Sequence, residues 1–355
     1  MSKKLILEYV WIDAEDNYRS KIKVVHHNIE KKEDEKEILK FITEWTFDGS
    51  STRQAVGTNS DVILHPVCVA TNPFIIGNGL IVLCECYNAN GTPHITNTRH
   101  KLVQTYEKCK DAKPLFGFEQ EYVLLNKSGE MYGWLNGNIP TFNADKGKTH
   151  KKEGYYCAVG TLNSIGRQFS NMHLENCLKA GLEICGTNSE VLPSQWEYQI
   201  GPLDPISLSD QVCISRYLLH RTSELINDCV VTLDPKPIEG WNGSGGHINY
   251  STEKMRSTNG IDEIINACEK LSLTHKQHLE VYGKGNERRL CGKYETSDVN
   301  SFSYGIADRG KSVRIPLLVN KAKCGYLEDR RPASNVDLYL ATEIILRTTL
   351  LNEEK

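Results

Sequence analysis

The sequence predicts an α+β protein of two domains, a small β-rich domain followed by a larger domain that mixes helices with strands. With 355 residues the chain is long enough to bury two hydrophobic cores. The first ninety residues consist mainly of short strand-like runs, whereas strands and amphipathic helices alternate in the rest. Residues 88–93 form a turn-rich cluster, which places the domains at 1–92 and 93–355.

The N-terminal domain is predicted to contain four strands. Residues 5–12 are apolar and aromatic, and residues 20–26 partly alternate polar with apolar side chains. Two further apolar runs, 61–64 and 80–86, complete the set. The charged residues 30–37 between them are interpreted as a solvated loop or a short exposed helix.

The second domain begins with helical spacing over residues 99–109, which Pro114 ends, and continues with a core strand over 116–125. Later helices are expected at 166–180, where Gly181 ends the helix, and at 209–230, 262–271 and 337–350. Strand-like runs lie between them at 194–200, 246–250 and 312–315.

Composition argues against several classes of function. The formal net charge is −3, so the chain has no basic character suited to nucleic acid or a membrane surface, and a charged substrate requires a local site. No apolar run approaches the roughly 20 residues of a membrane span, and the N-terminus has no signal-peptide core. Twelve cysteines without a Cys-x-x-Cys pair are typical of small buried side chains in a reducing compartment. We therefore expect a cytoplasmic protein.

Glu119 and Glu121 are two residues apart on the predicted core strand, so both side chains leave the same face. Two carboxylates packed in this way repel each other unless a cation neutralises them. Their hard oxygen ligands favour Mg²⁺ or Mn²⁺. An exposed acidic strand end is the alternative for this pair alone.

Two more glutamates support the metal hypothesis. Pro193 lies between Glu190 and Glu197, so a loop and the strand after it deliver these side chains. Glu197 stands in an apolar, aromatic strand, where an unpaired charge is costly.

A glycine-rich segment, residues 241–251, lacks the Gly-Lys-Ser/Thr of a P-loop. Its glycines would let the backbone approach a ligand closely. Within it, His247 is a candidate metal ligand or phosphate donor, with a structural histidine as the alternative.

The C-terminal third supplies positive charge in loop and strand-end contexts. Guanidinium groups bind carboxylates and phosphates through two oxygens at once. Glu328 stands just ahead of Arg330 and Arg331, where a surface charge cluster is the alternative interpretation. Acids together with arginines indicate phosphoryl transfer. The arginines are Arg288, Arg289, Arg309, Arg314, Arg330 and Arg331.

Six segments in order resemble the glutamine synthetase family, in its shorter, eukaryotic type. They are WTFDGSST (45–52), FEQEY (118–122), QWEYQIGP (195–202), NGSGGH (242–247), ETS (295–297) and EDRRP (328–332). The resemblance covers residues 9–351. It implies a β-grasp-like N-terminal domain and a C-terminal catalytic, ATP-binding domain with an antiparallel sheet flanked by helices. It also implies ATP-dependent ligation of ammonia to L-glutamate through γ-glutamyl phosphate.

The resemblance also implies roles for individual residues. One metal ion would be held by Glu121, Glu190 and Glu197, and the other by Glu119, His247 and Glu328. ATP would contact Glu197, Asn249, Tyr250, Ser251, Arg309, Arg314 and Tyr326. Glutamate would contact Gly240, Trp241, Gly243, Arg289, Arg309 and Arg330.

Asp48 resembles the residue that binds ammonium and takes its proton, and Glu295 resembles the flap residue that closes over the acyl phosphate; Arg309 completes the catalytic set. The family places its site between subunits, which implies a homo-oligomer, commonly two stacked pentameric rings. Because residues 9–13 follow the N-terminus so soon, we expect a shorter N-terminal arm than is usual in this type. Two alternatives stay open, a ligase of the same fold that uses a larger amine and a relative that keeps only the fold.

Overall fold

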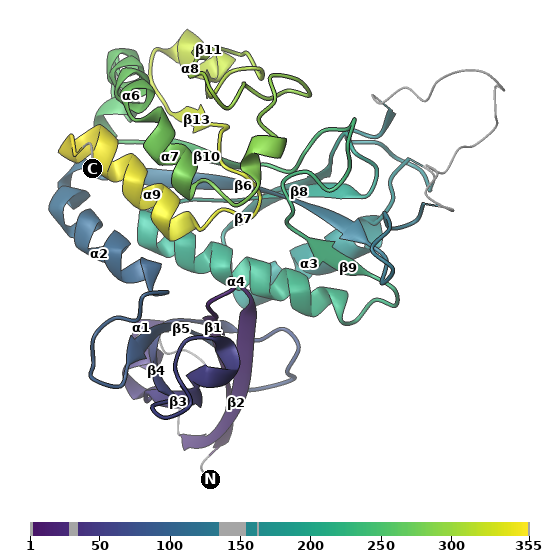
Figure 1. Cartoon of the computed structure of the whole chain (residues 1–355), viewed down its shortest axis with the longest axis vertical. Helices are drawn as coiled ribbons and strands as arrows, with labels where there is room; N and C mark the ends of the chain where they lie inside the picture. Colours follow the sequence, from purple (N-terminus) through teal and green to yellow (C-terminus); the bar gives the residue numbers. More distant parts are fainter. Residues whose placement is uncertain (1–2, 28–34, 135–153, 162, 354–355) are drawn as a thin grey trace.

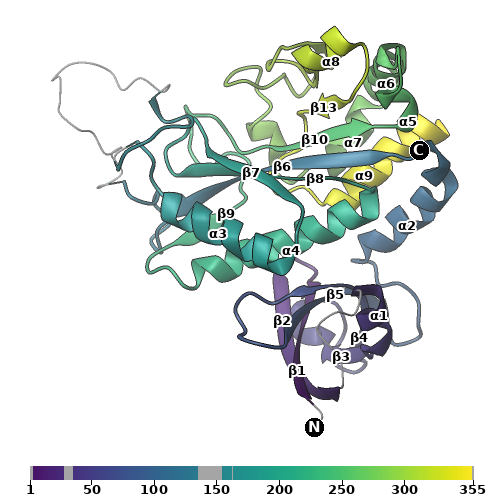
Figure 2. The ribbon, with the colours of Figure 1, turned by 180° about the vertical axis from the view of Figure 1, so that it is seen from behind.

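The chain folds around two β-sheets with helices between them (Figure 1). The computed structural model describes residues 3–27, 35–134, 154–161 and 163–353. Figure 2 shows the same arrangement from behind, with helix α4 between the N-terminal sheet and the larger sheet. Helix α4 contacts strands of both sheets, so it joins the two parts of the molecule. The predicted α+β class is confirmed, whereas the boundary at 92/93 stays a prediction.

The N-terminal sheet is curled and has the order β2-β1-β5-β4-β3. Its strands are β1 (Lys3–Ile12), β2 (Tyr18–His27), β3 (Trp45–Asp48), β4 (Asp61–Thr71) and β5 (Gly79–Asn88). Neighbouring strands are antiparallel except β1 and β5, which are parallel. The four predicted strands are present and β4 is longer than expected. Of the charged segment 30–37, residues 28–34 lie outside the described part, and α1 (Glu35–Phe41) begins within it.

The larger sheet has the order β11-β12-β13-β10-β6-β8-β7, and β9 also pairs with β6. The sheet is mixed: its paired strands are antiparallel, as predicted, except that the short strand β11 runs parallel to β12. The strands are β6 (Leu115–Leu125), β7 (Ile184–Ser189), β8 (Gln195–Leu203), β9 (Val230–Thr232), β10 (Gly246–Ser251), β11 (Tyr304–Ile306), β12 (Val313–Ile315) and β13 (Leu327–Asp329).

The helices are α2 (Thr98–Cys109), α3 (Arg167–Ala180), α4 (Pro205–Ser223), α5 (Glu253–Arg256), α6 (Ile261–Leu273), α7 (His275–Val281), α8 (Leu317–Ala322) and α9 (Leu338–Leu346), which continues as a π-helical turn (Arg347–Leu351).

The helix predicted at 209–230, which is α4, was misplaced. It begins at Pro205 because Asp204 accepts hydrogen bonds from Ile206 N and Ser207 N, which caps the first turn. It ends at Ser223, and the chain turns through Asp228 (φ 54°) into β9.

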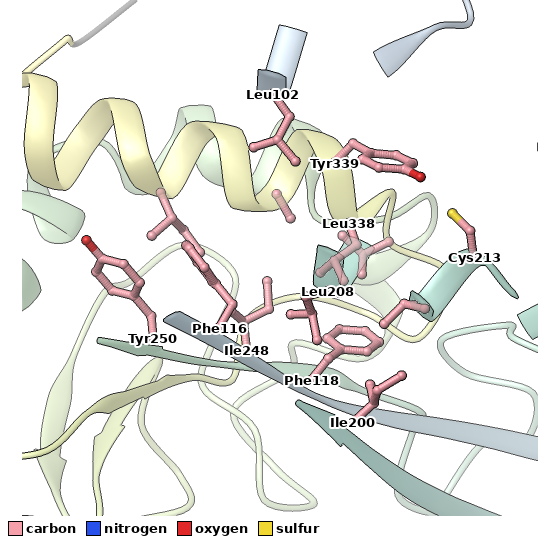
Figure 3. Close-up of a cluster of buried hydrophobic side chains, with 14 of the residues drawn as sticks. Leu102, Phe116, Phe118, Ile200, Leu208, Cys213, Ile248, Tyr250, Leu338 and Tyr339 are labelled. Atoms are coloured by element: carbon pink, nitrogen blue, oxygen red, sulfur yellow. The ribbon is translucent and has the colours of Figure 1, made fainter. Parts of the chain in front are cut away.

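The main hydrophobic core lies between this sheet and the helices α2, α4 and α9 (Figure 3). Phe116 and Phe118 of β6 and Ile248 and Tyr250 of β10 point into it. Because side chains alternate along a strand, the intervening residues leave the opposite face of the sheet. No helix in the described part of the chain is long and apolar enough to cross a membrane.

Candidate functional site

The alternation along β6 determines which side chains reach the face of the sheet opposite α4. Gln120 is fully buried on the helix side, where its Oε1 accepts a 2.6 Å hydrogen bond from Arg216 Nε of α4. Glu119 and Glu121, on either side of Gln120, therefore lie on the opposite face.

Two other candidate ligands lie close to His247. Strand β10 places His247 directly opposite Glu119 of β6, and β13 on its other side carries Glu328. His247 Nδ1 lies 3.3 Å from Glu119 Oε2 and 3.9 Å from Glu328 Oε1. Ligand atoms of these three side chains all lie within 4.8 Å of one another, a spacing that a single ion can bridge.

A second group shares the same histidine. Glu121 of β6 and Glu197 of β8 are direct cross-strand partners, and His247 Nε2 lies 3.9 Å from Glu121 Oε1. Ligand atoms of Glu121, Glu197 and His247 again lie within 4.8 Å of one another. Glu190 directly follows β7, and burial and then the Glu121 charge raise its pKa.

The pKa values show that nearby positive charge does not fully compensate these acids. Burial raises the pKa of Glu121 to about 7, although the Arg289 charge opposes the shift. Burial, and then the charge of Glu121, raises the pKa of Glu190 to about 8. Burial and the neighbouring carboxylates hold the pKa of Glu197 well above its ordinary value. Each carboxylate therefore resists ionisation unless a cation compensates.

These residues fit a hard divalent cation. Among the ion pairs between described residues, none joins a Lys or Arg to Glu121, Glu190 or Glu197. Burial, together with the charges of Arg330 and Arg289, holds the pKa of His247 well below its ordinary value, so the imidazole is neutral, the form that binds metals. Carboxylate oxygens with one imidazole suit Mg²⁺ or Mn²⁺.

Arginines lie beside the acids on the same side of the sheet. Glu328 accepts hydrogen bonds of 2.5 Å from Arg330 Nη1 at Oε1 and from Arg314 Nη1 at Oε2. The buried Nε of Arg314 has no hydrogen-bond partner among the described residues, so one guanidinium donor is left over beside the cluster. Such a donor suits an anionic group.

Arg289 contacts His247 and Arg330 through its guanidinium group. It is buried, and its Nη2 donates to Arg330 O (2.9 Å) and lies 3.2 Å from His247 Nε2. Burial lowers its pKa to about 10. A Cβ at Gly245 would lie 2.5 Å from His247 Nε2 and 2.7 Å from Arg289 Nη2, so this position requires glycine. The glycine-rich segment thus brings backbone close to the site's own side chains.

The chain is similar to known proteins over nearly its whole length. The family described as "Glutamine synthetase, catalytic domain" matches residues 96–280. A glutamine synthetase of Panulirus argus is 47% identical over 352 residues, covering 98% of this chain and 93% of the relative. The chain belongs to the glutamine synthetase family.

Plant and algal members are similarly close. The cytosolic isozyme 1-5 of glutamine synthetase from Arabidopsis thaliana is 44% identical over 355 residues, covering 99% of this chain and 96% of that protein. The chloroplastic glutamine synthetase of Chlamydomonas reinhardtii is 49% identical over 311 residues, covering 86% of this chain and 79% of that protein. The glutamine synthetase family that the six segments predicted is therefore confirmed over nearly the whole chain.

Not every site residue expected for a glutamine synthetase lies at the acidic cluster. Asp48 lies at the end of β3, on the edge of the N-terminal sheet, where it is exposed and accepts hydrogen bonds from Ser50 and Ser51. The helical layer with α4 separates this edge from the larger sheet (Figures 1 and 2). Within one chain, Asp48 and the cluster are therefore apart.

The remaining expected residues divide between the cluster and its surroundings. Arg309 is exposed, and its carbonyl oxygen accepts a hydrogen bond from Arg330 Nε (3.1 Å). After burial and the Glu121 charge, the charge of Glu295 also helps to raise the pKa of Glu190. The charges of Glu119 and Glu328 help to raise the pKa of Tyr326, although burial is the larger cause.

Five residues of the expected nucleotide and glutamate segments have their own structural partners. Asn249 Nδ2 donates to Glu119 Oε1 (2.9 Å), on the site face. Tyr250 points into the core, where its hydroxyl lies 2.8 Å from Thr349 Oγ1, so its side chain does not face the acids. Ser251 Oγ accepts a 2.9 Å hydrogen bond from Arg256 Nη1. Trp241 packs edge-on against Trp134 and Tyr155, and Gly243 O accepts from Gln195.

Sequence reasoning missed the amide side chains behind the acids. Asn188, Gln195 and Gln199 each donate a hydrogen bond to a carboxylate of the cluster. Their signal was present in the sequence, because Asn188 and Glu190, like Glu197 and Gln199, stand two residues apart. On β8 that spacing places Glu197 and Gln199 on one face of the strand.

Proposed function

We propose that this protein is a glutamine synthetase that joins ammonia to L-glutamate through γ-glutamyl phosphate, using ATP and yielding L-glutamine, ADP and phosphate. The observation that carries the proposal is the buried cluster of carboxylates around His247, beside two arginines, in a chain of this family. Acids that hold a divalent cation next to guanidinium groups suit transfer of the γ-phosphoryl group to a carboxylate.

In this proposal the residues hold two Mg²⁺ or Mn²⁺ ions. Bound metal supplies positive charge to the ATP phosphates and to the glutamate carboxylate. The raised pKa values of Glu121 and Glu190 support such a role, because they mark carboxylates that need a cation to ionise. The ion on the glutamate side is held by Glu121, Glu190 and Glu197, and the ion on the ATP side by Glu119, His247 and Glu328.

The arginines bind and orient the anionic groups. Arg314, which has a spare buried Nε–H, faces the nucleotide phosphates, and Arg330 with Arg309 neutralises charge on the transferred phosphoryl group. ATP also contacts Glu197, the 249–251 segment and Tyr326; for Tyr250 only the backbone is proposed. Glutamate lies against Gly240, Trp241, Gly243, Arg289, Arg309 and Arg330.

Asp48 holds the attacking nitrogen. Hydrogen bonds from Ser50 and then Ser51 hold the pKa of the Asp48 carboxyl below its ordinary value, so it stays anionic and suited to ammonium. As a carboxylate it accepts the proton that ammonium must lose before attack. Glu295 closes over the acyl phosphate and keeps water away.

The position of Asp48 supports an oligomer. Because Asp48 lies away from the acids of its own chain, a second copy must bring its Asp48 to the site. We propose a decamer of two stacked pentameric rings, located in the cytoplasm, with a β-grasp-like N-terminal domain ending near residue 92. Light scattering measures the size; a monomer that retains full activity would contradict shared sites.

Phosphate release from ATP tests the proposed reaction. We expect release that requires both L-glutamate and ammonium, with glutamine formed in equal amount. The matched assay replaces ammonium with methylamine or ethylamine at the same concentration. Higher turnover on an amine than on ammonium would instead indicate the amine ligase, and no release with any acceptor would indicate a relative without catalysis.

A further inference from the structure

Three acids of the cluster, Glu121, Glu190 and Glu197, each accept a hydrogen bond from a neutral amide side chain. Gln195 Nε2 donates to Glu121 Oε2 (2.8 Å), and Asn188 Nδ2 donates to Glu190 Oε1 (3.0 Å). Gln199 Nε2 donates to Glu197 Oε1. These three acids therefore share one kind of partner, and no Lys or Arg among the described residues forms an ion pair with them.

Two of these amides also bind each other. Gln199 Nε2 donates a second hydrogen bond to Asn188 Oδ1 (2.9 Å), while Asn188 turns its own amide nitrogen to Glu190. The Asn188–Gln199 pair thus links Glu197 to Glu190 through three consecutive hydrogen bonds. Since Asn188 of β7 lies opposite Glu197 of β8, the pairing of the two strands holds this bridge in place.

A glycine on β7 leaves room for the bridge. A Cβ at Gly186 would lie 2.9 Å from Gln199 Oε1. Apart from its neighbours in the chain, it would contact no other atom of the described residues. The register of β7 against β8 shifts between Ile184 and Gly186, which brings Gly186 opposite Gln199. A methyl group here would therefore displace the Gln199 amide without meeting backbone.

The third amide, that of Gln195, determines which oxygen of Glu121 stays available to a cation. Glu121 Oε2 accepts from Gln195 Nε2 and from Gly245 N, both at 2.8 Å, whereas Oε1 is the oxygen that lies 3.9 Å from His247 Nε2. Gln195 Nε2 also lies 3.0 Å from Gly243 O. Gln195 Oε1 is buried and has no hydrogen-bond donor among the described residues, and turning the amide over would place this oxygen against the Glu121 carboxylate. The nitrogen therefore faces the acid.

An amide suits this role because it donates a hydrogen bond without carrying charge. A Lys or Arg in its place would neutralise the carboxylate and weaken its attraction for a cation. A primary amide fixes one oxygen and leaves the full negative charge of the group available. Partners that orient metal-binding side chains in this way commonly contribute a factor of about 10–100 to metal affinity.

We propose that Asn188, Gln195 and Gln199 are positioning residues of the divalent-metal site, with the Asn188–Gln199 bridge setting the spacing of Glu190 and Glu197. This inference rests on the proposed function, because it requires that the acids bind a metal ion. It adds to that function the residues that orient the ligands and the glycine, Gly186, that accommodates them.

Binding of Mn²⁺ alone to the metal-free full chain tests the inference, with free Mn²⁺ measured by electron paramagnetic resonance at pH 7.5. We expect Asn188→Leu to raise the dissociation constant about 10–100-fold. Gly186→Ala, which leaves all ligands and amides chemically intact, should raise it by a smaller factor. The matched control is Asn176→Leu, since Asn176 is a buried amide of α3 that donates to Thr222 Oγ1 and to no carboxylate.

The outcomes separate this inference from the proposed function. Unchanged Mn²⁺ affinity in both Asn188→Leu and Gly186→Ala, with wild-type protein that binds Mn²⁺, would overturn the inference alone. Wild-type protein that binds no Mn²⁺ would overturn the proposed metal site and the inference with it. An equal loss in Asn176→Leu would show a general effect on folding and would also overturn the inference. If Asn188→Leu fails to fold, Gly186→Ala decides.

Discussion

Asp329 and Arg331, two residues apart at the end of β13, form an ion pair in which both side chains are fully buried, with 2.6 Å between Oδ2 and Nη2. Arg331 Nε also donates to Asp329 Oδ1 (2.9 Å), and Tyr282 donates to Oδ2 (2.8 Å). Glu328 and Arg330 pair with each other at the acidic cluster. Alternate residues of this short segment therefore form two separate ion pairs, one at the site and one in the interior.

Removing one partner of the interior pair should destabilise the protein strongly. We expect Arg331→Met to lower the free energy of unfolding by about 3–5 kcal/mol, because Asp329 is left as an uncompensated buried charge. Chemical denaturation at a fixed protein concentration measures the loss. The control is Lys284→Met, since Lys284 pairs with Asp16 at the surface and should cost less than about 1 kcal/mol. Equal losses in the two variants would contradict the buried-pair argument.

Glu121→Ala should remove both metal binding and catalysis. Glu121 belongs to the group within reach of His247 and Glu197, so its loss removes one ligand and also the carboxylate acceptor of Gln195. We expect Mn²⁺ affinity and the rate of phosphate release to fall together. Glu130→Ala is the matched control, because Glu130 is exposed and bonds to Asn126. A rate equal to that of the wild type would refute the metal role of Glu121.

Metal binding should tighten as the pH rises. Burial raises the pKa of Glu121 to about 7 and that of Glu190 to about 8, so below these values the metal-free site holds protons that a cation must displace. We expect Mn²⁺ affinity to increase between pH 6 and pH 8.5, with protons released on binding. Titrations in two buffers of different ionisation enthalpy measure the release, and Glu190→Gln should reduce it. Affinity independent of pH would contradict the raised pKa values.

The same shifts predict the stability of the metal-free protein. A carboxyl whose pKa is higher in the folded state binds more protons when folded, so stability falls as pH rises from the ordinary carboxyl pKa through 7 to 8. Saturating Mn²⁺ should reverse this trend. Melting temperatures at pH 6 and pH 8, with and without Mn²⁺, check both statements.

Acid should destabilise the protein partly through His173. Burial lowers the pKa of this histidine of α3 to about 4, while Ser215 O lies 3.0 Å from its Nε2. Between pH 6.5 and about 4 the unfolded chain takes up a proton that the folded chain refuses, so stability decreases as pH falls through this window. The contribution at pH 5 is about 2 kcal/mol relative to pH 7.

His173→Gln provides the check for this histidine. The difference in unfolding free energy between pH 7 and pH 5 should be smaller by that amount in the variant than in the wild type. The buried histidines His247 and His278, whose pKa values are also lowered, leave a residual acid dependence in both proteins. An unchanged difference would show that His173 does not contribute.

Much of the fold could be predicted because its elements carry local signals. Strand β6 can be predicted from residues 116–125 alone. Helix α3 ends at Gly181, whose φ of 84° lies in the left-handed region that glycine favours. The short strands β3, β7, β9, β11 and β13 were missed, since three to six residues hold too little periodicity to be distinguished from loops. The start of α4 differs from the prediction, because Asp204 and Pro205 cap the helix ahead of residue 209.

The sequence by itself determined the family, the two-part α+β organisation and the shared face of Glu119 and Glu121. These conclusions depend on residue order and on the two-residue period of a strand, both of which are local. They needed no knowledge of which strands are neighbours.

Only the tertiary structure decided the register that makes one histidine the neighbour of four acids. Pairing of β10 with β6 and β13, and of β6 with β8, brings His247, Glu119, Glu328, Glu121 and Glu197 together from four separate strands. It also determined that Tyr250 faces the core, and that Gln199 bridges Glu197 to Asn188. Strand pairing is non-local, and a shift of one residue would turn each of these side chains to the other face.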